Sequence, residues 1–110
     1  MKFCFAVVLL LLIHCPAQAA DALPSRLLEL EELAVDKFSE ADAEFRLLLK
    51  NTSEPQQLLK VQQSYCWVIA VQDPARALQL AEEYKKQQQD LMWQLRFLLC
   101  EGYAKEQQDK

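Results

Sequence analysis

The chain has 110 residues, 52% hydrophobic and 25% charged, with a formal net charge of −4, which is enough for one small domain. It contains one glycine and one histidine, His14, which lies in a segment expected to be removed. Without histidine or glycine loops there is no Ser/His or Cys/His nucleophile pair, no Cys2His2 zinc site and no phosphate-binding loop. We therefore expect no catalytic residue, no metal ligand and no cofactor, and we predict that the protein is not an enzyme.

Residues 1–19 have the three-part pattern of a secretory signal peptide. Lys2 supplies a positive charge, residues 3–13 form an apolar run, and Ala17-Gln18-Ala19 is a small-x-small cleavage site. Cleavage after Ala19 or the next residue would leave a mature domain of residues 20–110, exported to the periplasm or, alternatively, secreted. The apolar run is too short to cross a bilayer comfortably. We thus expect no membrane span after its removal, with an uncleaved anchor as the alternative.

The mature chain has the apolar periodicity of amphipathic helices. Apolar residues recur at spacings of three and four, as in Leu91, Leu95 and Leu98, and β-branched residues are few. Capping side chains stand beside prolines where helices are expected to begin, as at Asp73-Pro74. In chain order, the predicted helices cover residues 24–37, 40–51, 54–72, 74–88 and 90–107.

An offset of 34 residues relates parts of this helical region to one another. It aligns residues 39–43 with Asp73-Pro74-Ala75-Arg76-Ala77, and Cys66 with Cys100. This is the length of the tetratricopeptide (TPR) repeat. Residues 73–81 resemble the start of a TPR second helix, in which the small Ala77 permits close helix approach, and residues 99–105 resemble the middle of a first helix. The resemblance implies an all-α fold of antiparallel helical hairpins stacked as a short TPR-like array; a three- or four-helix bundle is the alternative.

The array is expected to be incomplete at its C-terminal end. By the repeat offset, the helix over residues 90–107 corresponds to a first helix, whose apolar residues call for a second helix to pack against them. We therefore expect the chain to continue into more protein or to pair with a second copy, as a homodimer through this C-terminal helix.

The cysteines of the mature chain are Cys66 and Cys100, because Cys4 and Cys15 lie in the signal segment. Disulfides persist in exported proteins, so one disulfide, two free thiols and an intermolecular bridge all remain open. Equivalent first-helix positions lie about 8 to 10 Å apart between axes, whereas a disulfide needs Cα atoms within about 7 Å. This distance argues against the intramolecular bond.

The TPR resemblance implies a concave groove, formed by first helices, that binds a peptide or a partner's helix. The groove residues would be Gln62, Gln63, Ile69, Arg96, Phe97 and Tyr103. Alternatively, Ile69, Phe97 and Tyr103 belong to the core, and both tryptophans, Trp67 and Trp93, are expected to pack rather than to bind a ligand.

The predicted function is a non-catalytic, extracytoplasmic protein–protein interaction module. Loss of Lys2 with the signal gives the mature chain a net charge of −5, so nucleic acids are not expected as partners. The alternative function is the periplasmic sensory N-terminal region of a membrane-bound signalling protein, such as a diguanylate cyclase or a histidine kinase.

Overall fold

The computed structural model of the chain describes residues 22–110, so the predicted signal peptide at residues 1–19 lies outside the described residues. Over residues 22–110 the chain forms five helices and no strand, which confirms the all-α fold class. A first helix covers residues 22–36. It is followed by α2 (Phe38–Asn51), α3 (Pro55–Gln72), α4 (Pro74–Gln87) and α5 (Leu91–Gln108). Each predicted boundary lies within two residues of the observed one.

Acidic side chains begin the last three helices. Glu54, Asp73 and Asp90 each accept hydrogen bonds from backbone N–H groups two or three residues further along the chain. A proline follows Glu54 and Asp73 at the first helical position. Proline has no N–H, and none is needed there because an N–H at this position has no acceptor within the helix. These signals end and restart the helix within one to three residues, so that successive helices pack as antiparallel neighbours.

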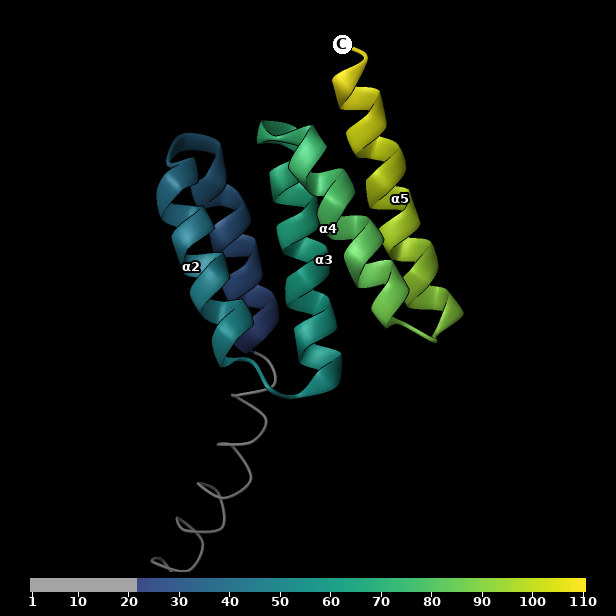
Figure 1. The fold of residues 1–110 in the computed structure, drawn as a ribbon. Coiled ribbons are helices and arrows are strands. Elements are labelled where there is room, and N and C mark those ends of the chain that lie inside the picture. Colours follow the sequence, from purple (N-terminus) through teal and green to yellow (C-terminus); the bar gives the residue numbers. More distant parts are fainter. Residues whose placement is uncertain (1–21) are drawn as a thin grey trace, which may run out of the picture.

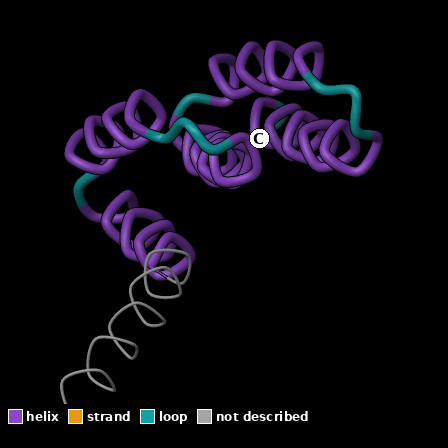
Figure 2. Tube along the Cα trace, turned by 90° about the horizontal axis from the view of Figure 1, so that it is seen from below, coloured by secondary structure: helices purple, strands orange, loops and turns teal. Residues whose placement is uncertain are grey.

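The helices are stacked as hairpins around α3. Each helix runs opposite to the one before it (Figure 1). Seen along the axis of α3, the 22–36 helix and α2 lie on one side of it, and α4 and α5 lie on the other (Figure 2). The stacked-hairpin arrangement that the sequence predicts is therefore present.

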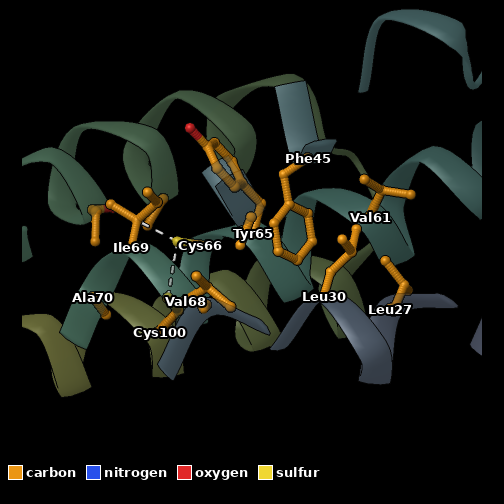
Figure 3. Close-up of a cluster of buried hydrophobic side chains, with 14 of the residues drawn as sticks. Leu27, Leu30, Phe45, Val61, Tyr65, Cys66, Val68, Ile69, Ala70 and Cys100 are labelled. Atoms are coloured by element: carbon orange, nitrogen blue, oxygen red, sulfur yellow. Dashed lines mark hydrogen bonds between the residues drawn. The ribbon is translucent and has the colours of Figure 1, made fainter. Parts of the chain in front are cut away.

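Two clusters of buried side chains hold the stack together. The larger surrounds α3 and includes the fully buried Phe45, Tyr65 and Ile69 (Figure 3). The smaller joins α3, α4 and α5 through Leu59, Tyr84, Trp93 and Phe97. Trp93 is buried in this cluster, so its predicted packing role is confirmed. Fully buried alanines, among them Ala41, Ala77, Ala81 and Ala104, allow the helices to approach closely.

A charged cluster fastens α2 and α4 to the same central helix. The hydroxyl of Tyr65 donates to Asp42 Oδ1 at 2.5 Å and accepts a hydrogen bond from Arg76. Arg76 and Arg46 both form ion pairs with Asp42. Burial, and then the hydrogen bond to Asp42, raises the pKa of Tyr65, so the phenol stays protonated and able to donate.

No helix over residues 22–110 is long and apolar enough to pass through a membrane.

Candidate binding groove

An open apolar hollow of about 370 Å³ lies between the 22–36 helix, α3 and α5. A second hollow of about 400 Å³ is lined by the 22–36 helix and α3, and the two hollows share Glu31 and Trp67. We call these two adjoining hollows the groove. The first hollow is lined by Glu31, Ala34, Val35, Trp67, Val68, Val71, Gln72 and Tyr103. The second adds Pro24, Leu27, Lys60, Gln63 and Ser64.

An aromatic pair forms the floor of the groove. Trp67 on α3 and Tyr103 on α5 are both half-buried, with ring centroids 5.0 Å apart and ring planes inclined at 49°. Both rings pack against the larger buried cluster, which fixes their positions. Val35 and Val71 flank them and are 78% and 58% exposed. The groove thus exposes an apolar surface to solvent, and the core holds the two aromatic side chains of that surface in place.

The polar groups of the groove are concentrated toward the second hollow. Ser64 Oγ donates a hydrogen bond of 2.7 Å to Glu31 Oε1, which links α3 to the 22–36 helix. Lys60 and Gln63 line the same hollow. The second hollow therefore carries an ammonium group that the first lacks, while Glu31 contributes its carboxylate to both.

The groove presents apolar side chains, hydrogen-bonding groups, one carboxylate and one ammonium group. Its lining residues include neither a thiol nor an imidazole. Across residues 22–110, no three His, Cys, Asp or Glu side chains are gathered so that they could hold a metal ion.

The structure corrects part of the predicted groove. Gln63 and Tyr103 do line it. Ile69 and Phe97 do not, because both side chains are fully buried within the two core clusters. These two residues belong to the core, which the sequence left open as the alternative.

Two further predicted residues lie away from the groove lining. Gln62 is half-buried, and the exposed Arg96 places its guanidinium 4.6 Å from the ring centroid of Trp93. The reason is helical register. The groove face of α3 carries Lys60, Gln63, Ser64, Trp67 and Val71, at spacings of three and four. The prediction combined residues of this face with the core residues Ile69 and Phe97 and with the exposed Arg96 of α5.

Sequence reasoning missed the contribution of the 22–36 helix. Glu31 and Val35 lie on that helix, and Trp67 and Val71 face them from α3. A signal was present, because Trp67 and Val71 share a helix face with polar residues rather than with the core stripe. Such apolar residues on a polar face are candidates for a binding surface.

Cys66 and Cys100 meet between α3 and α5. Their Sγ atoms are 2.8 Å apart and both residues are fully buried. Both are free thiols in this structure, which is one of the alternatives that the sequence left open. The two helices nevertheless bring the sulfur atoms into contact, and the fully buried Ala70 and Ala104, which follow one turn later, permit close approach. An intermolecular bridge would need a sulfur atom at the surface, and neither residue provides one.

No protein-family model, curated protein or solved structure matches the chain.

An ion pair between α4 and α5 gives a testable pH dependence. Lys85 Nζ donates to Glu101 Oε2 at 2.9 Å, and this bond lowers the pKa of Glu101 below its usual value. A lowered pKa stabilises the folded state above the unfolded-state pKa of about 4.3, and the stabilisation is lost as the pH falls through the folded-state value. Glu101→Gln should therefore cost about 1 kcal/mol of the free energy of unfolding at neutral pH, and less in acid.

Urea unfolding at neutral pH and at about pH 3 measures this effect. Glu106→Gln, at an exposed position on the same helix, is the control. Equal losses of stability for Glu101→Gln at both pH values would contradict an electrostatic role for this pair.

Proposed function

We propose that the chain is a non-catalytic protein–protein interaction module that acts outside the cytoplasm, and that its groove holds an α-helix of a partner protein. The observation that carries the proposal is the apolar groove itself, with the Trp67–Tyr103 floor flanked by the exposed Val35 and Val71. Action outside the cytoplasm is supported by the signal-peptide pattern of residues 1–19.

The arrangement of the helices supports a TPR-like array. The 22–36 helix, α3 and α5 occupy the first, third and fifth places in the chain, which are the first-helix places of successive hairpins. The groove is lined by these three helices alone. In stacked-hairpin arrays, one set of equivalent helices lines the concave binding surface. The 34-residue offset between Cys66 and Cys100, which meet in space, fits the same interpretation.

A helix suits this groove better than an extended peptide does. An extended peptide must find partners for its backbone N–H and C=O groups when it loses water. The groove is lined almost entirely by helical residues, whose backbone groups are already paired, and its floor is apolar. An α-helix satisfies its own backbone, so it can lay a stripe of apolar side chains across Trp67 and Val71 without that cost.

The test uses designed peptides of about 18 residues with apolar side chains at helical spacings of three and four. A scrambled peptide of the same composition lacks the stripe. We expect saturable binding of the amphipathic peptide, measured by anisotropy of a labelled peptide, and weak or no binding of the scrambled one.

Matched variants locate the binding surface. Val71→Glu places a charge in the groove and should weaken binding at least about tenfold, because an apolar contact is lost and a carboxylate is desolvated. Leu28→Glu is the control, since Leu28 is as exposed as Val71 (57% and 58%) but lies outside the groove. Equal binding by the two variants, or no binding of any amphipathic helix, would overturn the proposal.

We also infer that the exposed face of α5 pairs with a second copy of the chain. At Val61 and Tyr65 of α3 the side chains are covered, whereas Leu95 and Leu99, one 34-residue offset later, are 49% and 58% exposed. Leu91, Met92 and Leu98 extend this apolar face. A symmetric contact would bury the face of both copies at once.

A further inference from the structure

We propose that Cys66 and Cys100 form an intramolecular disulfide that joins α3 to α5 in the mature protein. The two side chains come from different helices, 34 residues apart in sequence, and point toward one another (Figure 3). Their Sγ atoms are 2.8 Å apart. A disulfide bond is about 2.05 Å long, so the two sulfur atoms need only a small further approach. This inference does not depend on what occupies the groove.

Formation of the disulfide would leave no buried group near the sulfur atoms without a hydrogen-bond partner. Cys100 Sγ donates to Cys66 Sγ, and Cys66 Sγ donates to the carbonyl oxygen of Ala77 at 3.6 Å. Oxidation removes both S–H donors. The Ala77 carbonyl lies within α4, where the helix itself supplies a donor. No buried polar group would therefore lose its only partner.

The reaction is thiol–disulfide exchange with a small-molecule disulfide, such as oxidised glutathione, as the oxidant. The thiolate of one cysteine attacks this disulfide, forms a mixed disulfide and releases one small-molecule thiol. The thiolate of the second cysteine then attacks the first cysteine's sulfur and displaces the second small-molecule thiol. Two electrons pass to the oxidant, and the two protons lost by the cysteines are taken up by the two released thiolates.

Exchange should take place while the chain is folding. In the folded protein both cysteines are fully buried, and the hydrogen bond from Cys100, followed by burial, raises the pKa of Cys66. Few thiolates then form, and no oxidant reaches them. Oxidation during refolding should accordingly be at least about tenfold faster than oxidation of the folded, reduced chain, which must first open locally.

Peptide mapping identifies the bond directly. The full chain is unfolded with its thiols reduced, refolded with oxidised glutathione, alkylated and cut with trypsin. The expected product joins residues 61–76 to residues 97–105, with a mass about 2 Da below the sum of the two peptides because two hydrogens are lost. Alkylation of Cys66 and Cys100 in separate peptides, or their bonding mainly to Cys4 or Cys15, would overturn the proposal.

Thermal unfolding measures the consequence for the fold. Closing the loop that contains α4 restricts the unfolded chain, so the refolded protein should melt about 10 °C or more above the same sample after reduction. The double variant Cys66→Ala/Cys100→Ala is the control and should melt at one temperature under both conditions. The wild-type comparison needs no substitution, so it remains decisive if the variant does not fold. Equal melting temperatures of the oxidised and reduced wild type would contradict a stabilising cross-link.

Discussion

Ala77→Trp is expected to unfold the domain at room temperature, whereas Ala75→Trp on the same helix is expected to leave it folded. Ala77 is fully buried on α4, and its carbonyl oxygen lies 3.6 Å from Cys66 Sγ of α3. Overpacking by a few methylene groups costs about 1 to 3 kcal/mol, and an indole adds far more volume than that. Ala75 is exposed on α4, so the same substitution there adds little strain.

Circular dichroism during heating separates the two outcomes. The stability of a small domain is about 5 to 15 kcal/mol in total, so the loss at Ala77 should remove a cooperative transition altogether. The Ala75→Trp variant should keep a transition within a few degrees of the wild type. Similar melting curves for the two variants would show that α4 does not pack against α3 through Ala77.

The helices and their limits could be predicted from sequence because their causes are local. Spacing of apolar residues sets the helical period, and Glu54, Asp73 and Asp90 stop one helix and begin the next through hydrogen bonds within three residues. The order of the hairpins followed from the short connections and the 34-residue offset. None of these inferences required knowledge of the distance between helices.

The groove was only partly predictable because it depends on which helix faces meet. Trp67 and Ile69 are two residues apart on α3, yet Ile69 is fully buried and Trp67 lines the groove. A rotation of the helix by part of a turn would exchange their environments. The sequence alone indicates an apolar stripe, and the width of that stripe leaves the rotation undetermined. The position of the 22–36 helix beside α3 determines which face of α3 lines the groove.

The distance between Cys66 and Cys100 could likewise not be predicted from the sequence. A general separation between helix axes of about 8 to 10 Å suggested that Cys66 and Cys100 lie beyond easy reach of a disulfide. The actual approach is set by the small side chains around them, including Ala70 and Ala104, which are fully buried on the same two helices. The 34-residue offset placed the two cysteines at equivalent positions, and only packing shows that these positions face each other.

Substitution of the exposed face of α5 should separate a dimer into monomers. Leu95 and Leu99 lie one turn apart and are both about half exposed. In an antiparallel pairing of two α5 helices, each copy would cover these side chains of the other. Burying a leucine contributes about 1.5 to 3 kcal/mol, so Leu95→Glu/Leu99→Glu should weaken self-association by more than about a hundredfold, and like charges across the contact add to the loss.

Sedimentation or light scattering of the full chain across micromolar concentrations measures this directly. Leu47→Glu provides the matched control, because Leu47 is 54% exposed on α2, on the opposite side of α3 from α5. It carries the same change of side chain at similar exposure, so it should leave self-association unchanged if pairing uses α5. A wild type that stays monomeric over this range would refute the pairing. A dimer that Leu47→Glu disrupts as strongly as the α5 variant does would place the contact elsewhere on the molecule.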